Sequence, residues 1–192
     1  MNRLRFNFSE CVHVYYKDSS CNLCVKVCPV EGAVIQKDYR VSVNSKKCVS
    51  CGACVGACPS EAFSLSGFDV DALFKTLKEE PLLSCKKNLP CLSTLSVEDI
   101  VTAVINGGSD VVFDTGQCKD CFIGTLLEEI NKKVDEANYI LEKLGVENRA
   151  IIEDLKAAPE EKTENRRRSF LKNFGKAAAG LTFWALMPGF LL

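Results

Sequence analysis

Residues 48–59 read CVSCGACVGACP. The four thiols of this stretch belong to Cys48, Cys51, Cys54 and Cys58, and Pro59 follows the last of them. Thiols spaced by two residues suit the chelation of one metal centre better than disulfide pairing. The small residues between them, Gly52, Ala53, Gly56 and Ala57, let the backbone come close and aim its N–H groups at a bound centre. The stretch therefore predicts a loop wrapped around metal.

A second cysteine motif precedes it, at residues 21–29, CNLCVKVCP. After the Cys-Pro ending the chain continues VEGAVI in the first motif and SEAFSL in the second, which makes the two halves an internal repeat. Each half runs from a cysteine loop through a short helical turn to a short strand. Residues 34–36 and 41–43 flank a polar turn, so we expect a hairpin there.

The C-x2-C-x2-C-x3-C-P spacing and the repeat resemble the two-cluster bacterial ferredoxins. The resemblance implies two [4Fe–4S] clusters, with ligands exchanged between the halves. It assigns the second cluster site to Cys28, Cys48, Cys51 and Cys54. A zinc-ribbon-like site is the alternative, but the intact four-thiol run and the two Cys-Pro endings favour iron.

The first cluster site departs from the ferredoxin pattern. The motifs supply Cys21, Cys24 and Cys58, but the regular position of the fourth thiol is occupied by Asp18. Cys11 can complete the site, Asp18 can ligate through oxygen, or the site holds only three irons. We favour Cys11, because thiolate is the preferred ligand. The lone histidine, His13, is expected to be a surface or partly buried side chain.

A different pattern of elements begins at residue 68. We expect a helix capped by Asp69, a strand at 81–83, a helix with a Ser96–Asp99 capping box, a strand at 111–113, a long helix from about Ile123 and a strand at 149–152. This succession predicts an α/β layer with parallel strands. The fold class is therefore α+β: a ferredoxin-like domain (1–67), a small α/β domain (68–156) and a C-terminal tail (157–192).

A third cysteine set falls at the expected strand ends. This sheet-edge site comprises Cys85, Cys91, Cys118 and Cys121. Ligands of open α/β sheets bind at the carboxyl edge. We also place Cys118 and Cys121 at the start of the long helix, whose dipole is expected to lower their thiol pKa. A third iron–sulfur cluster, most simply [2Fe–2S], is favoured over a structural zinc and over a Cys118–Cys121 dithiol.

Residues 89–121, LPCLSTLSVEDIVTAVINGGSDVVFDTGQCKDC, and 136–152, EANYILEKLGVENRAII, resemble the small iron–sulfur delta subunit of hydrogenase–heterodisulfide reductase complexes. The resemblance implies a [2Fe–2S] centre that passes electrons between partner subunits, with metal ligation by the four sheet-edge cysteines. Proteins of this combined kind also resemble accessory proteins of formate dehydrogenase and hydrogenase systems.

The tail contains a motif of another kind. Residues 167–172, RRSFLK, resemble the twin-arginine export motif, and the sixteen residues that follow Lys176 carry no charge. Because a membrane span needs about 20 apolar residues, the tail is a marginal one. We expect residues 166–192 to act as a membrane anchor or as a contact to the export machinery, or to be the start of a fused or truncated exported protein. The remaining alternative is a basic amphipathic tail that packs on the protein.

Composition narrows the function further. The chain has 192 residues, twelve cysteines, one histidine and a net charge of −1, which gives no reason to expect nucleic acid. We find no secretory h-region, dinucleotide fingerprint or nucleophile–base pair. The sequence predicts a cytoplasmic electron carrier rather than an enzyme. If the tail is an anchor, it attaches the protein to the cytoplasmic face of the inner membrane. Its expected partner is a redox enzyme of formate dehydrogenase or hydrogenase type. The alternative is an assembly or export factor for a periplasmic redox enzyme.

Overall fold

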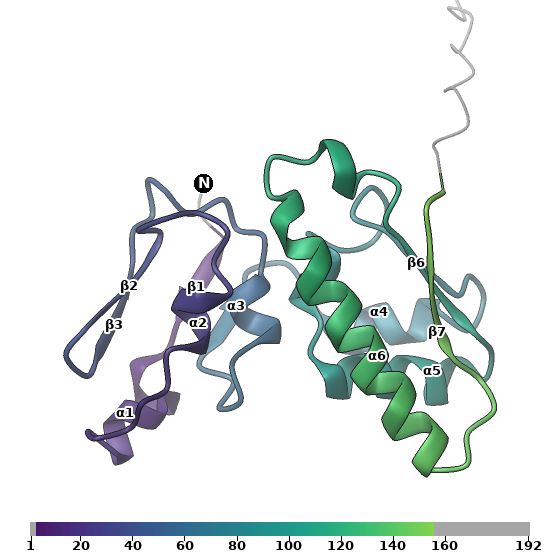
Figure 1. Ribbon diagram of the computed structural model, residues 1–192, viewed down its shortest axis with the longest axis horizontal. Helices are drawn as coiled ribbons and strands as arrows, with labels where there is room; N and C mark the ends of the chain where they lie inside the picture. The colour runs from purple at the N-terminus through teal and green to yellow at the C-terminus, as the bar shows by residue number, and fades with distance from the viewer. Residues whose placement is uncertain (1–2, 156–192) are drawn as a thin grey trace, which may run out of the picture. The chain divides into compact units, whose positions relative to one another are not determined.

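Within residues 3–67 the chain forms two separate antiparallel strand pairs (Figure 1). Strand β1 (Leu4–Phe6) pairs with β4 (Phe63–Leu65). Strand β2 (Val34–Lys37) pairs with β3 (Arg40–Val43) in a register that places Val34 opposite Val43. The second pair confirms the expected hairpin, whereas β1 has no counterpart among the predicted elements.

Short helices carry the cysteine motifs of this part. Each motif leads into a one-turn helix, α2 (Leu23–Lys26) or α3 (Ala53–Gly56). The segment before them folds into a 3₁₀ turn, η1 (Phe8–Glu10), and another one-turn helix, α1 (Val12–Tyr15). Loop, helical turn and strand therefore follow one another in both halves, as the repeat predicts.

Residues 68–155 contain a parallel sheet of order β5-β6-β7 with helices between its strands (Figure 1). The strands are β5 (Leu82–Leu83), β6 (Val111–Asp114) and β7 (Ala150–Glu153). Helix α4 (Val70–Thr76) precedes the sheet, and the crossover helices α5 (Val97–Gly107) and α6 (Leu127–Lys143) pack against each other. The structure confirms the α+β fold, with a ferredoxin-like region followed by parallel strands and helices.

The helix caps form as the sequence predicts. The Asp69 carboxylate accepts from the backbone N–H groups of Asp71 and Ala72 at 2.9 and 3.2 Å. Ser96 and Asp99 form the reciprocal capping box, with distances of 2.9 and 3.0 Å. Both caps satisfy N–H groups that have no partner inside the first helical turn.

The long helix begins later than expected. It starts at Leu127, and residues 118–126 instead contain two 3₁₀ turns, η3 (Cys118–Asp120) and η4 (Gly124–Leu126). A Cβ on Gly124 would lie 2.3 Å from the Cys118 carbonyl oxygen, so the chain folds back on itself before the helix starts. The expectation that Cys118 and Cys121 lie in the first turn of the helix is wrong.

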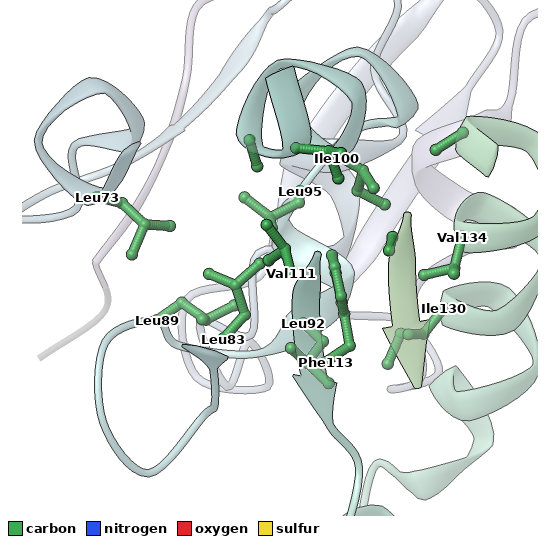
Figure 2. Close-up of a cluster of buried hydrophobic side chains, with 14 of the residues drawn as sticks. Leu73, Leu83, Leu89, Leu92, Leu95, Ile100, Val111, Phe113, Ile130 and Val134 are labelled. Carbon is green, nitrogen blue, oxygen red and sulfur yellow. The ribbon is translucent and has the colours of Figure 1, made fainter. Parts of the chain in front are cut away.

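A hydrophobic core joins the sheet to its helices (Figure 2). Leu83, Val111 and Phe113 of the sheet are fully buried, as are Ile100 and Leu141 of the helices. Each such side chain stabilises the fold by roughly 1.5–3 kcal/mol relative to its exposed state. The core includes Ala53 of α3, and Val27, Val30 and Cys51 pack against it, so buried contacts continue across residue 67.

The computed structural model describes residues 3–155. The charged linker, the twin-arginine-like motif and the apolar tail expected at 157–192 lie outside the described residues. Among the helices in the described part of the chain, none is long and apolar enough to cross a bilayer.

Two leucines near the end of α6 provide a matched test of the core. We expect Leu141→Ala to lower the free energy of unfolding by about 2–5 kcal/mol, because the lost methyl groups leave a cavity. Leu144→Ala removes the same atoms from a side chain that is 61% exposed and is expected to change stability by at most about 0.5 kcal/mol. Urea unfolding of anaerobically prepared protein measures both, and equal losses would contradict the packing.

Candidate metal centres

The four cysteines of the second cluster site line one hollow. Cys28, Cys48, Cys51 and Cys54 face it together with apolar residues that include Leu4, Val30, Ala33 and Val49. The walls are therefore thiol-bearing and otherwise apolar, which suits a soft-ligand metal centre shielded from water. The residues present fit a [4Fe–4S] cluster.

The backbone between these cysteines needs unusual conformations. Ser50 and Gly52 both have positive φ values, of 57° and 82°. A Cβ on Gly52 would lie 2.5 Å from Thr94 Oγ1 and 2.7 Å from a Leu65 methyl carbon. Glycine at this position therefore allows both the turn of the loop and the close approach of the neighbouring segment.

Burial dominates the acidity of these thiols. It raises the pKa of Cys54 and of Cys51, and the neighbouring cysteines raise the pKa of Cys54 further. A thiolate is the form that binds metal, so each of these cysteines must release its proton when a metal centre binds. Binding of a metal centre at this site therefore releases protons.

The first cluster site brings Cys11 close to the thiols of the motifs. Burial is the main cause that raises the pKa of Cys24 to about 11, and the charges of Cys21, Cys58 and Cys11 raise it further. Cys11 and Cys24 are buried in the same hydrophobic cluster, against which Cys58 packs. A backbone N–H of Ala62 donates to Cys58 Sγ at 3.4 Å, a contact that stabilises thiolate. This arrangement also fits a four-thiolate centre.

Asp18 and His13, the other candidates for this site, have different surroundings. Asp18 is exposed and lines a surface hollow formed by residues 12 and 14–20. His13 is buried, with 2% of its surface exposed, and its Nε2 donates to the Cys21 carbonyl at 2.8 Å. We therefore assign His13 the role of fixing the Cys21 backbone, which the sequence had not predicted.

The four sheet-edge cysteines line a third hollow. Cys85, Cys91, Cys118 and Cys121 share it with apolar side chains of the following helix, among them Leu127 and Ile130. Cys85 and Cys121 are exposed, whereas Cys91 and Cys118 are half-buried. Nowhere in residues 3–155 do three Cys, His, Asp or Glu side chains close into the tight group that a single ion requires.

The Cys118 thiol differs from the expectation based on the helix dipole. Burial raises its pKa to about 11, and the charges of Cys91, Cys85 and Cys121 add to the effect. The dipole acts only within the first helical turn, and Cys118 precedes the helix by nine residues. The expected lowering of its pKa is therefore wrong.

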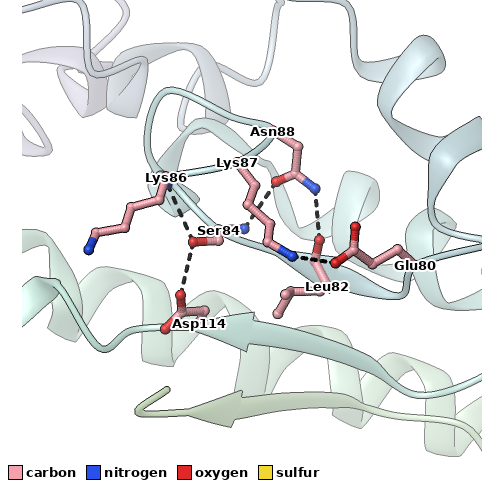
Figure 3. Close-up of polar contacts among 7 residues, drawn as sticks. All are labelled: Glu80, Leu82, Ser84, Lys86, Lys87, Asn88 and Asp114. Carbon is pink, nitrogen blue, oxygen red and sulfur yellow. Dashed lines mark hydrogen bonds and ion pairs between the residues drawn. The ribbon is translucent and has the colours of Figure 1, made fainter. Parts of the chain in front are cut away.

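A polar network holds the two strand ends that carry these cysteines (Figure 3). Ser84, next to Cys85, donates from its hydroxyl to Asp114 Oδ2 at 2.9 Å, at the end of β6. Asn88 accepts from the Ser84 N–H at 3.0 Å and donates to the Leu82 carbonyl at 2.7 Å. Because Ser84 and Asp114 are buried, this network fixes the distance between the strand ends.

The second cluster site and the sheet-edge site adjoin each other. The Thr94 hydroxyl donates to the Cys51 carbonyl at 2.8 Å, and the Thr94 N–H donates to the Cys91 carbonyl at 3.0 Å. The charge of Cys91 also contributes to raising the pKa of Cys51. Thr94 therefore links a cysteine of one site to a cysteine of the other through two hydrogen bonds.

Comparison with known proteins bears on the N-terminal part. Residues 19–62 match the family model of the 4Fe-4S dicluster domain. The N-terminal region is a dicluster ferredoxin domain. A domain of this kind implies two [4Fe–4S] clusters in this region.

The curated relatives include a ferredoxin and an iron–sulfur subunit of a redox enzyme. The chain is 38% identical over 53 residues to a ferredoxin of Rickettsia felis, which covers 28% of this chain and 43% of that protein. It is 30% identical over 94 residues to NADH-quinone oxidoreductase subunit I of Pelobacter propionicus, covering 37% and 50%. It is 46% identical over 37 residues to the formate dehydrogenase-O iron-sulfur subunit of Escherichia coli, covering 19% and 12%.

These matches are partial. The chain spans at most half of the length of these relatives. It spans 17%, 16% and 13% of the length of three other curated relatives. No solved structure matches the chain.

The fourth ligand of the first cluster site is testable by a pair of substitutions. We expect Cys11→Ser to lower the iron content by at least one iron per chain and to change the EPR spectrum of the reduced protein, because a thiolate ligand is lost. Asp18→Asn is the matched control and is expected to leave both unchanged. Unchanged iron and EPR in Cys11→Ser would show that Cys11 is not a ligand.

The polar network predicts a selective effect on the sheet-edge site. We expect Ser84→Ala to reduce metal at that site while both ferredoxin clusters are retained, because Asp114 loses a donor and the β5 end is released; the cost in stability is about 1–3 kcal/mol. Metal analysis with EPR measures this. The control is Lys87→Ala, which removes only the exposed ion pair with Glu80. Equal metal content in both variants would contradict the role of the network.

Proposed function

We propose that this chain is an electron-relay protein that passes single electrons through two [4Fe–4S] clusters to a third metal centre at the sheet edge. When bound, each cluster supplies one-electron oxidation and reduction. The chain's own residues bind the centres and hold them at fixed separations, and the apolar lining of the second site keeps water away from its cluster.

The observation that carries this proposal is the serial arrangement of the three cysteine sets. The first and second cluster sites meet where Cys24 and Cys54 lie in one hydrophobic cluster and interact electrostatically. The second and the sheet-edge sites meet at Cys51 and Cys91. Within residues 3–155 the second cluster site therefore adjoins both of the others, and the first cluster site and the sheet-edge site each adjoin only the second.

The packing of the chain supports a relay in which the separations stay constant. Thr94 is 1% exposed and Ser93 is fully buried, so the segment after Cys91 is held inside the protein. Apolar side chains line the hollow of the second site. Short, fixed and dry paths between centres are what single-electron transfer requires.

We propose that the sheet-edge centre is [2Fe–2S] rather than zinc. The resemblance to the delta subunit supports an iron–sulfur centre there, and so does its position beside a ferredoxin cluster. Its four thiols also suit iron–sulfur chemistry. A redox-inactive zinc would end the relay at the second site.

We further propose that the partner is a redox enzyme of formate dehydrogenase or hydrogenase type. Similarity to an iron–sulfur subunit of formate dehydrogenase-O supports this. The similarity to the delta subunit supports a hydrogenase-linked partner in the same way.

Metal content tests the proposal directly. We expect anaerobically isolated protein to contain roughly ten irons and as many acid-labile sulfides, eight from two [4Fe–4S] clusters and two from the sheet-edge centre. Cys91→Ser is expected to leave about eight. In partly reduced wild-type protein, EPR should show spin–spin interaction that Cys91→Ser simplifies.

Two results would contradict parts of this proposal. Eight irons with one zinc in the wild type would remove the third redox centre and leave a two-cluster carrier. Protein that binds no iron after anaerobic isolation and reconstitution would overturn the electron-relay function itself.

A further inference from the structure

Helix α6 carries a lysine that is almost completely buried. Lys133 is 6% exposed, whereas its neighbour Lys132 lies at the surface and forms an ion pair with Glu128 at 2.7 Å. Burying an ammonium group is costly unless its donors are satisfied and its charge is compensated. The burial of Lys133 therefore needs a structural reason, whereas the exposure of Lys132 does not.

The three N–H donors of the Lys133 ammonium all reach backbone carbonyls. Lys133 Nζ donates to Gly56 at 3.0 Å, to Ser93 at 3.1 Å and to Leu95 at 3.0 Å. Gly56 lies in α3 between Cys54 and Cys58, and Ser93 and Leu95 follow Cys91. One ammonium group thus joins α6 to the cysteine loop of the ferredoxin domain and to the segment that leads from the sheet-edge site.

The charge of this group is not neutralised by direct contact. None of the ion pairs in residues 3–155 includes Lys133. Burial lowers the pKa of Lys133, while the charges of Glu129, Asp99 and Cys91 oppose this effect from further away. Of these three groups, Cys91 is also a ligand of the proposed sheet-edge centre.

The backbone around Lys133 is closely packed. A Cβ on Gly56 would lie 2.5 Å from the carbonyl oxygens of Thr94 and Leu95 and 2.6 Å from that of Ser93. Three carbonyl oxygens therefore crowd against α3, and Lys133 donates to two of them, those of Ser93 and Leu95, and to the carbonyl of Gly56 itself. Without the ammonium group these oxygens would repel one another in a buried environment.

We propose that Lys133 is the positioning residue of the junction between the second cluster site and the sheet-edge site, and that its positive charge raises the reduction potential of the centres at this junction. The inference rests on the proposed relay. Reduction adds negative charge to a centre, and a fixed cation in a low-dielectric interior stabilises that charge. The first cluster site, beyond the second, receives less of this effect.

Redox titration of variants tests the inference. We expect Lys133→Met, with metal content unchanged, to lower the equilibrium constant for reduction of a junction centre at least tenfold, which is 59 mV for a one-electron couple. Lys133→Arg keeps the charge and is expected to restore most of the potential. Lys132→Met, the matched control on the same helix, should leave every midpoint at its wild-type value.

A second variant protects the test against loss of the fold. Lys133→Gln removes the charge but retains two N–H donors, so the junction keeps part of its hydrogen bonding. Wild-type midpoints in a metal-replete Lys133→Gln or Lys133→Met protein would overturn the inference. A lowered midpoint in Lys133→Gln supports the role of the charge separately from the hydrogen bonds.

The same measurements separate this inference from the proposed third centre. If wild-type protein holds only the two [4Fe–4S] clusters, the third centre is wrong, and the inference is then judged on the midpoint of the second cluster alone. If the third centre is present and no midpoint responds to Lys133→Gln, the relay stands and the inference fails.

Discussion

The segment from Cys91 to Leu95 packs so closely on α3 that Gly56 has no room for a side chain. This contact determines the relation between the two halves of the described structure. It places the Thr94 hydroxyl on the Cys51 carbonyl and collects three carbonyl oxygens around one ammonium group. A larger residue at position 56 would separate the ferredoxin part from the sheet, because the obstructing atoms belong to the backbone and cannot rotate away.

Local rules account for much of what the sequence predicted. Thiol spacing indicated the cysteine loops, and the repeat indicated that each loop leads through one helical turn to a strand. The Ser96–Asp99 pair specified the start of α5 because its hydrogen bonds lie within four residues. The parallel sheet followed from the alternation of apolar runs and helical periodicity. These features depend on short stretches of chain, so the sequence alone contains the information.

Other features depend on contacts between distant segments. Helical spacing places Lys133 beside Ile130 and Ala137 on the apolar face of α6 and Lys132 on the opposite face. The carbonyl groups that accept from Lys133 lie 38 to 77 positions away, and no local pattern indicates them. The pairing of β1 with β4 and the burial of His13 arise in the same way. The helix start was misplaced because apolar spacing continues through Ile123 and Leu126, while the close approach of Gly124 to Cys118 favours 3₁₀ turns. Tertiary packing decided each of these cases.

The three cysteine sets differ in solvent exposure, and this difference distinguishes the two ends of the proposed relay. Cys11 and Cys24 are buried at the first site and Cys54 at the second, whereas the sheet-edge site exposes Cys85 and Cys121. Phe122, beside Cys121, is 80% exposed, so an apolar side chain stands next to the open thiols. Electron exchange with another protein requires a centre near the surface, because transfer weakens steeply with distance. In the proposed relay the sheet-edge site is therefore the end at which a partner is met, and the polar network of Ser84 and Asp114 keeps that end rigid while it is exposed.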